Sequence, residues 1–401
     1  MKQLLLSLLL ILAFTAFAGD TVRPGLERIE QSLPDAEESA FLDAFKQPFF
    51  DGMDVSESLQ CWFDGRLLSQ QKQNRLAKVK WMEAMHKLKN VKPLPKTEWG
   101  PWPDATFTVV KPLNLPSHPM VSIDLVEWTV DNLKQYGIVL YPKNPVKDAR
   151  YPLFLYCHGA AFGLPGDFMV FLADLVERGY VIVGPAMRGE DVFQFPFPIN
   201  GKELKCEGEI ENLDGEVNDC LSMLSATWKL PYAQPDSFAM IGHSFGSGVG
   251  LLCAARAGER CKAVVSYDAW LVSPQRYYWD RMARGANNWL SWADFCNQPV
   301  EAQLSGLMTR SIVHNAEKLT APLLLFIGGA YEGSVFHQSH DDLIVRLKKL
   351  GKSYSYHVMP GGGHNFVLYT ESKPALDALA IQTEFLAKHF PPANKTEKAA
   401  D

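Results

Sequence analysis

The sequence predicts an open α/β fold, in which a mostly parallel central sheet carries helices on both faces. Two observations predict it. From about residue 107 onward, short β-rich runs alternate with helix-like segments, which is the pattern of strand–helix–strand crossovers. Several of these runs are apolar throughout rather than alternating, as strands that are buried on both faces of a parallel sheet must be.

The expected elements follow one another along the chain without an internal repeat. Strands are expected at residues 107–110, 121–128, 137–141, 153–157, 181–184, 238–242, 263–267, 323–328 and 354–359. Helices are expected between them and after them, at residues 168–178, 214–230, 245–257, 341–350 and 375–389.

The composition is that of a globular protein with ample apolar material for a core. Of the 401 residues, 47% are hydrophobic and 21% are charged, which excludes a disordered chain, a collagen-like chain and a coiled coil. The chain has 39 Lys and Arg against 45 Asp and Glu, a formal net charge of −6, so nothing favours a nucleic acid as partner. Seven Cys are too few for a disulfide scaffold.

The first 18 residues have the layout of a secretory signal peptide. Lys2 gives a positive start, residues 4–17 form an apolar run, and residues 16–18 (Ala-Phe-Ala) are a small-x-small cleavage signal. The alternatives are a buried helix and an uncleaved anchor, but the run is too short to span a bilayer comfortably. We expect cleavage near Ala18/Gly19, a secreted or periplasmic protein, and no integral membrane span in the mature chain.

The remaining chain divides by composition. Residues 19–105 are expected to form a helical N-terminal extension, which ends in a stretch broken by four prolines. Residues 106–390 form the expected α/β domain, with an insertion at residues 271–316. Residues 391–401 are expected to form a flexible tail.

Disulfides are an open question if the protein is exported. Cys206 could pair with Cys220, and Cys253 with Cys261, but a sequence does not give connectivity. Cys157, at the end of an apolar strand, is expected to be a buried free thiol.

The strongest chemical signal is Gly242-His243-Ser244-Phe245-Gly246, which lies directly between an expected strand and an expected helix. A sharp strand-to-helix turn needs glycine on both sides of the serine, and it exposes the hydroxyl at the edge of the sheet. The alternative is the glycine-rich turn of a nucleotide-binding protein. However, the glycines do not form G-x-G-x-x-G, and no Lys-Ser or Lys-Thr pair follows.

Two further loops supply what an acyl-transfer site needs besides a nucleophile. The stretch after strand 153–157 consists of small residues and glycines that let a substrate approach the backbone, so the N–H of Ala160 is one candidate oxyanion donor. The N–H of Phe245, the residue after the serine, is the other. His364 follows three glycines and is the candidate base for Ser244. An ordinary glycine-rich turn is the alternative for the first loop.

No metal or cofactor is expected. His337, His340 and Asp341 are close in sequence, but many solvated helix starts share this spacing.

Taken together, His158–Gly163, Gly242–Gly246 and Gly361–Phe366 resemble the α/β-hydrolase superfamily over residues 121–390. Within it, Gly242–Gly246 and the stretch Asp268-Ala269-Trp270 resemble the secreted platelet-activating-factor acetylhydrolases, a family of phospholipases. Residues 206–220 and 360–364 look more like dienelactone hydrolases and prolyl oligopeptidases. The resemblance implies an α/β-hydrolase fold and a triad in the chain order Ser, acid, His.

Two residues are candidates for the triad acid. Asp268 ends the strand after the serine turn, where it resembles the acid of the acetylhydrolases. Glu332 lies in the loop after strand 323–328, where most of the superfamily carries an acid. Both would lie at the carboxyl edge of the sheet. We favour Asp268, because an Asp is present there without substitution.

The substrate pocket is expected to be aromatic, with Phe162, Trp270 and Trp279 as candidate lining residues. The insertion is rich in Trp and Tyr and is either a lid over an apolar substrate or a helical cap that packs on itself. The sequence therefore predicts an exported serine hydrolase that cleaves a small-molecule ester or lipid through an acyl-enzyme, without a cofactor.

Two alternatives stay open. One is a serine peptidase of the prolyl oligopeptidase type, although such enzymes usually carry a β-propeller and residues 19–106 are few and helical. The other is a non-catalytic α/β-hydrolase that serves as a binding module.

Overall fold

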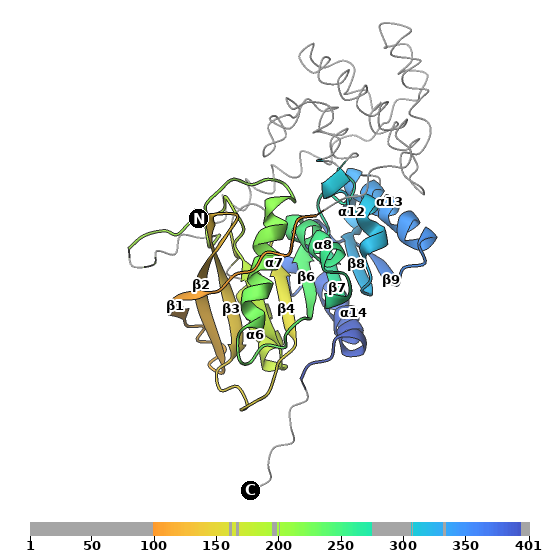
Figure 1. Ribbon diagram of the computed structural model, residues 1–401. Coiled ribbons are helices and arrows are strands. Elements are labelled where there is room, and N and C mark those ends of the chain that lie inside the picture. Colours follow the sequence, from red (N-terminus) through yellow and green to blue (C-terminus); the bar gives the residue numbers. More distant parts are fainter. Residues whose placement is uncertain are drawn as a thin grey trace, which may run out of the picture.

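The computed structural model describes residues 99–159, 163–165, 168–194, 199, 201–274, 306, 308–331 and 334–393. These residues form one nine-stranded sheet with helices packed against it (Figure 1). The strands are β1 (Thr108–Leu113), β2 (Val121–Val130), β3 (Leu133–Pro142), β4 (Leu153–Cys157), β5 (Val181–Pro185), β6 (Phe238–His243), β7 (Cys261–Tyr267), β8 (Leu323–Gly328) and β9 (Tyr354–Met359). The helices are α6 (Phe168–Glu177), α7 (Gly215–Trp228), α8 (Phe245–Ala257), α12 (Ile312–Asn315), α13 (Val335–Lys349) and α14 (Lys373–His389).

The strand order is β1-β2-β3-β5-β4-β6-β7-β8-β9. β1, β2 and β3 pair antiparallel, and β3 pairs antiparallel with β5. From β5 to β9 every pairing is parallel, so the carboxyl ends of these strands lie at one edge of the sheet. The predicted mostly parallel sheet is confirmed.

Two hydrophobic clusters cover the two faces of this sheet. Along β4, Leu153 and Leu155 belong to the cluster that also contains residues of α7, α8, α12 and α13. Phe154 and Tyr156, which alternate with them, belong to the cluster that contains residues of α6 and α14. The predicted helices on both faces are therefore confirmed, and every residue of β4, β5, β6 and β8 is buried.

The β2–β3 hairpin and the start of α13 extend beyond the predicted bounds. β2 and β3 form a continuous hairpin, whose turn residues Asp131 and Asn132 both have positive φ, at 54° and 61°. α13 begins at Val335 rather than at residue 341, because the hydroxyl of Ser334 accepts a hydrogen bond from the N–H of His337 and caps the helix. Polar residues 337–340 are buried in its first turns, so no apolar periodicity marked them.

The five described cysteines are all free and buried. Neither of the two pairings that the sequence left open, Cys206 with Cys220 and Cys253 with Cys261, is therefore formed. Cys206 instead contacts the backbone of Tyr136 on β3, and Cys220 lies with its sulfur 3.8 Å from the sulfur of Cys157. The expectation that Cys157 is a buried free thiol is confirmed.

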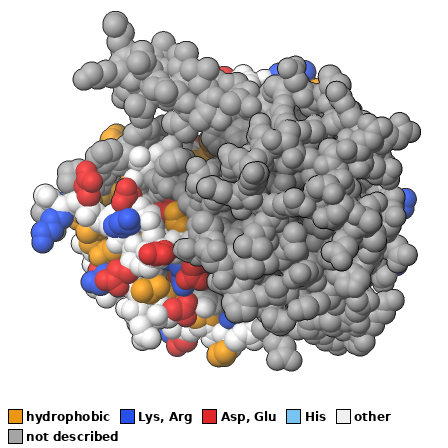
Figure 2. Space-filling view, turned by 90° about the horizontal axis from the view of Figure 1, so that it is seen from above, with side chains coloured by type: hydrophobic (Ala, Val, Ile, Leu, Met, Phe, Trp, Pro, Cys, Tyr) orange, Lys and Arg blue, Asp and Glu red, His pale blue; other side chains and the backbone are white. Residues whose placement is uncertain are grey.

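Figure 2 shows Lys and Arg side chains interspersed with Asp and Glu on the part of one face that the structure describes. This mixture agrees with the nearly balanced composition. Among the described residues, no helix is both long and apolar enough to cross a membrane. The predicted signal peptide, residues 19–98, most of the insertion and residues 394–401 lie outside the described residues.

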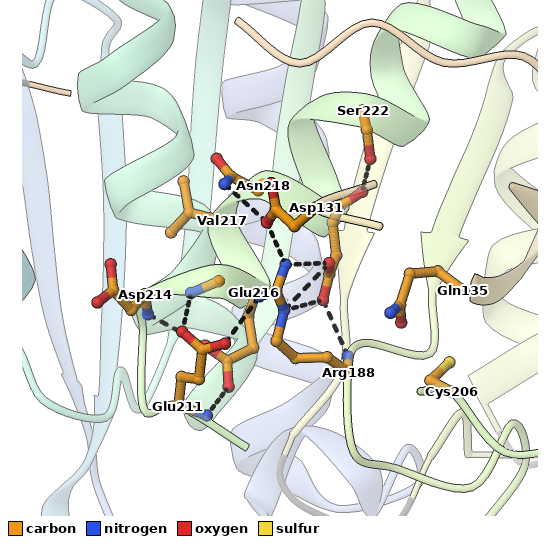
Figure 3. Close-up of polar contacts among 12 residues, drawn as sticks. Asp131, Gln135, Arg188, Cys206, Glu211, Asp214, Glu216, Val217, Asn218 and Ser222 are labelled. Atoms are coloured by element: carbon orange, nitrogen blue, oxygen red, sulfur yellow. Dashed lines mark hydrogen bonds and ion pairs between the residues drawn. The ribbon is translucent and has the colours of Figure 1, made fainter. Parts of the chain in front are cut away.

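A cluster around Arg188 connects three parts of the fold (Figure 3). Arg188 follows β5, and its guanidinium donates to Asp219 on α7, to Asp131 in the β2–β3 turn and to Glu211 before α7. The shortest of these N···O distances are 2.8, 2.7 and 2.7 Å, respectively. Asp219 also accepts from the backbone N–H of Arg188 at 2.9 Å. The cluster, defined by these four residues, fixes α7 against the sheet.

Candidate active site

Ser244 occupies the one-residue turn between β6 and α8. Its backbone has φ 54° and ψ −120°, a region that L-residues rarely adopt. The turn depends on the flanking glycines. A Cβ at Gly246 would overlap the carbonyl group of Cys157, and a Cβ at Gly242 would lie 2.8 Å from the Cα of Ser247. The local sequence therefore forces the serine onto the carboxyl edge of the sheet, as predicted for a nucleophile elbow.

His364 reaches Ser244 from the loop after β9. Its Nε2 lies 2.7 Å from the Oγ of Ser244, although the two residues are 120 positions apart in the sequence. Burial lowers the pKa of His364 well below its ordinary value, and the neighbouring His243 lowers it further. A neutral imidazole at this distance can accept the serine proton directly.

Asp268 follows β7 and is fully buried. Its Oδ1 accepts a hydrogen bond from the backbone N–H of Gly328 at 2.8 Å, whereas Oδ2 has no hydrogen-bond partner among the described residues. A carboxylate oxygen of Asp268 and a ring nitrogen of each of His243 and His364 lie within 4.8 Å of one another. Burial raises the pKa of Asp268, against the effect of the Gly328 hydrogen bond.

The structure therefore brings one of the two acid candidates to His364. Glu332, the other candidate, lies outside the described residues. The geometry favours Asp268 as the acid, and its role stays a prediction.

One of the two candidate oxyanion donors is described. Phe245 is the first residue of α8 and is buried, so its N–H belongs to the helix N-terminus beside Ser244. Ala160 lies outside the described residues, but Gly159 just before it approaches the site closely. A Cβ at Gly159 would lie 2.9 Å from Nδ1 of His243 and 3.5 Å from the Cβ of Ser244.

The described pocket candidate is Trp270, which is 5% exposed. Its backbone N–H donates to the carbonyl of Ser244 at 2.8 Å, and its ring centroid lies 5.6 Å from that of Phe336 on α13. Phe336 in turn packs edge-on against His364 at 4.9 Å. Phe162 and Trp279 lie outside the described residues. Sequence reasoning missed Phe336, because nothing marked the polar start of α13 as part of the site.

Sequence reasoning also missed His243, although it stands inside the G-x-S-x-G motif. Its Nε2 lies 2.8 Å from the carbonyl oxygen of His364. Burial lowers the pKa of His243 to about 4. His337 and His340 contact backbone carbonyls: His337 Nε2 lies 3.1 Å from the carbonyl oxygen of Gly328, and His340 Nδ1 lies 2.8 Å from that of Phe336.

The sequence pattern of the prolyl oligopeptidase family matches residues 167–392, more than half of the chain. The chain belongs to the prolyl oligopeptidase family. Family membership and the observed sheet confirm the predicted α/β-hydrolase superfamily and the predicted class of enzyme, a serine hydrolase. The resemblance to the acetylhydrolases and the preference for esters over peptides stay predictions. No curated protein sequence matches the chain significantly.

Solved structures that match the chain include both peptidases and esterases. The acylaminoacyl peptidase of Pyrococcus horikoshii is 18% identical with a TM-score of 0.48, and the match covers 74% of this chain but only 44% of that protein. Acetyl xylan esterase 1 from Thermoanaerobacterium sp. JW/SL YS485 is 17% identical with a TM-score of 0.48, covering 77% and 92% of the two chains. The acetyl xylan esterase from Paenibacillus sp. R4 is 16% identical with a TM-score of 0.49, covering 80% and 96%.

Proposed function

We propose that the protein is an exported serine hydrolase that cleaves carboxylic esters through an acyl-enzyme. The observation that carries the chemistry is the 2.7 Å distance between Ser244 Oγ and His364 Nε2, on a serine whose φ is 54°. A serine in an ordinary loop has no reason to adopt such a backbone or to face a partly buried imidazole.

The reaction follows from this geometry in two halves. Ser244 Oγ attacks the acyl carbon of the ester while its proton passes to His364 Nε2, and the carbonyl oxygen becomes an oxyanion facing the N–H of Phe245. The tetrahedral intermediate collapses, the C–O bond to the alcohol breaks, and His364 returns the proton to the leaving oxygen. A water molecule then attacks the acyl-enzyme with His364 again as base, which releases the acid and restores Ser244.

Asp268 has an electrostatic role in this scheme. Burial keeps His364 neutral at rest, so the imidazole is ready to accept a proton. Once it is protonated, the imidazolium carries a charge that is largely shielded from water, and the nearby carboxylate of Asp268 offsets it. Activity is therefore expected to fall only well below pH 6.5, when His364 becomes protonated before substrate binds.

The choice of an ester rests on the apolar surroundings of the base. Phe336 packs against His364 and Trp270 packs against Phe336, so the base lies in aromatic surroundings that suit an acyl or aryl group. The resemblance of Gly242–Gly246 and Asp268–Trp270 to the acetylhydrolases favours a lipid-like ester with a short acyl group. A peptide is the second candidate, because the family that matches the chain is named for a peptidase.

Labelling with a fluorophosphonate probe tests the catalytic proposal. The folded protein should be labelled, and Ser244→Ala should lose both the label and about 10⁴-fold or more of its esterase activity. A folded parent protein that takes no label would instead support a non-catalytic binding module. Hydrolysis of p-nitrophenyl esters of graded chain length, beside peptidyl p-nitroanilides, then separates the two substrate classes. Faster turnover of the anilides would overturn the ester proposal and leave the serine hydrolase intact.

Export is a separate proposal that rests on Lys2, the apolar residues 4–17 and the cleavage signal at residues 16–18. Expression of the full chain in a bacterium, followed by N-terminal sequencing of the periplasmic and medium fractions, should give a protein that begins at Gly19. Recovery of the intact N-terminus in the cytoplasmic fraction alone would contradict export.

A further inference from the structure

His364, the proposed catalytic base, lies on a loop whose glycines restrict the backbone only weakly. Gly361, Gly362 and Gly363 precede His364, and Gly361 adopts a positive φ of 71°. Backbone bonds hold the residues on either side. Ala330 N–H donates to the carbonyl of Gly362 at 3.0 Å, and Phe366 N–H donates to the carbonyl of Gly363 at 3.0 Å. These bonds hold the carbonyl groups of Gly362 and Gly363, whereas the carbonyl of His364 faces His243.

We propose that His243 is the positioning residue for the catalytic base: its imidazole donates a hydrogen bond to the carbonyl oxygen of His364 and so fixes that residue relative to Ser244. This inference rests on the proposed function, since it assigns a role within the same reaction. The supporting contact is the 2.8 Å distance between His243 Nε2 and His364 O. One peptide bond separates His243 from Ser244, so the nucleophile and the base loop are joined through a single side chain.

The ring of His243 is held firmly enough for this role. The residue is 5% exposed, and its ring centroid lies 5.3 Å from that of His364. On its other side, Nδ1 lies so close to Gly159 that a Cβ there would be 2.9 Å away. The ring therefore lies close to both the loop after β4 and the loop after β9.

The protonation state of His243 suits a donor. Burial lowers its pKa to about 4, so the ring is neutral over the range in which a serine hydrolase works. A neutral imidazole carries one N–H, and a carbonyl oxygen can only accept. The hydrogen therefore sits on Nε2, and Nδ1 faces Gly159. A ring nitrogen of His364 and a carboxylate oxygen of Asp268 lie within 4.8 Å of a ring nitrogen of His243.

Three substitutions separate positioning from simple packing. His243→Gln places its amide nitrogen the same number of bonds from Cβ as Nε2, and so keeps a donor for the carbonyl of His364. His243→Asn places its amide at the level of Nδ1, too short to reach. His243→Leu fills the space without any donor.

The proposal predicts a drop in kcat that depends on the donor. Asn and Leu should lower kcat for a p-nitrophenyl ester by about 10- to 100-fold with KM within about twofold, because a small displacement of the base slows proton transfer without weakening substrate binding. Gln should stay within about threefold of the parent protein. The rate of fluorophosphonate labelling should follow kcat, and the melting temperature should show which variants are folded.

Failure of this proposal differs from failure of the proposed function. A parent protein that takes no fluorophosphonate label ends the catalytic scheme itself. If the parent is labelled and His243→Leu keeps kcat within twofold, the positioning role is wrong. If His243→Leu does not fold, the matched pair decides: equal kcat values for the Gln and Asn variants overturn the role, and a tenfold or larger advantage of Gln supports it.

Discussion

Two groups of polar side chains lie beyond strands of the sheet, Arg188 after β5 in one and Ser244 and Asp268 after β6 and β7 in the other. They differ in how far their hydrogen bonds are satisfied. In the Arg188 cluster, one guanidinium meets three carboxylates, and Asp219 receives both the side chain and the backbone N–H of Arg188. At the active site, Asp268 Oδ2 accepts no hydrogen bond from the described residues, and Ser244 Oγ faces a single imidazole.

Backbone strain does not explain the difference. Ser244 and Asp268 have positive φ values of 54° and 47°, but Asp131 in the Arg188 cluster has one of 54° as well. What differs is the saturation of the polar groups. A buried network in which every polar group is paired stabilises one arrangement. A buried acceptor without a hydrogen-bond partner can instead stabilise a positive charge that forms during the reaction. The first arrangement suits a structural support and the second suits catalysis.

The largest expected effect comes from removing the charge of the acid. Asp268→Asn should lower kcat by about 10³- to 10⁴-fold, because a neutral amide neither orients His364 in the same tautomer nor stabilises its imidazolium. The variant should fold, since Asn can still accept the hydrogen bond from Gly328 N–H through its Oδ1. Turnover of p-nitrophenyl acetate, normalised to the folded fraction, measures the effect.

Glu332→Gln is the matched control for this substitution, and its kcat should stay within about threefold of the parent value. The opposite pattern, near-native turnover for Asp268→Asn with a loss of orders of magnitude for Glu332→Gln, would make Glu332 the acid. The unpaired carboxylate oxygen of Asp268 would then not be the feature that distinguishes the active site from the Arg188 cluster.

The next effect should appear in stability rather than in turnover. Arg188→Met leaves Asp219 buried without its partner, which should lower the free energy of unfolding by about 3–5 kcal/mol. Because Arg188 does not contact Ser244, His364 or Asp268 in any described bond, kcat of the folded variant should stay within about threefold. Urea denaturation and steady-state kinetics on the same preparation measure both quantities.

A surface ion pair supplies the control. Lys373 and Asp377 lie one turn apart on α14 at 2.7 Å, and the Lys373 side chain is 83% exposed. Lys373→Met should leave the unfolding curve nearly unchanged, since solvent screens such a pair. A similar small loss for Arg188→Met would show that the Arg188 cluster is not the structural support that its bonds suggest.

Much of the fold could be predicted because buried parallel strands have a strong local signature. β4 and β8 have the bounds that their apolar runs predicted, at Leu153–Cys157 and Leu323–Gly328. Elements with mixed signals were less clear. The first turns of α13 carry buried polar side chains, and β3 starts directly after a two-residue turn, so neither start showed in the pattern of hydrophobicity.

The candidate site divides in the same way. Ser244 and His364 lie beside glycines in turns whose backbone geometry requires glycine. The glycine pattern in the sequence therefore indicated both residues. His243 and the Arg188 cluster act through contacts between distant parts of the chain. Glu211 and Asp219 lie in the acidic stretch between Cys206 and Cys220, and they bind Arg188, which is 23 and 31 residues away. Contacts between residues that are far apart in the sequence leave no periodic pattern from which they could be predicted.

The smallest expected effect concerns a carboxyl group beside the Arg188 cluster. Glu216, in the first turn of α7, is fully buried and accepts backbone N–H bonds from Glu211 at 2.7 Å and Asp214 at 3.0 Å. Burial raises its pKa from 4.5 to about 7, with the nearby charge of Asp219 acting in the same direction. The folded state therefore holds this proton more tightly than the unfolded state does.

The direction of the pH dependence follows from that difference. The contribution of Glu216 to stability is complete below about pH 4.5 and is lost as the pH rises through about 7, so it amounts to a loss on the order of 3 kcal/mol between pH 4.5 and pH 8. Glu216→Gln should remove this component and flatten the curve of unfolding free energy against pH. Glu384→Gln, an exposed carboxyl group on α14, should leave the slope unchanged. Parallel curves for Glu216→Gln and the parent protein would mean that Glu216 stays ionised in the fold, held by its two backbone donors against the cost of burial, and the Arg188 cluster would then include one more buried charge.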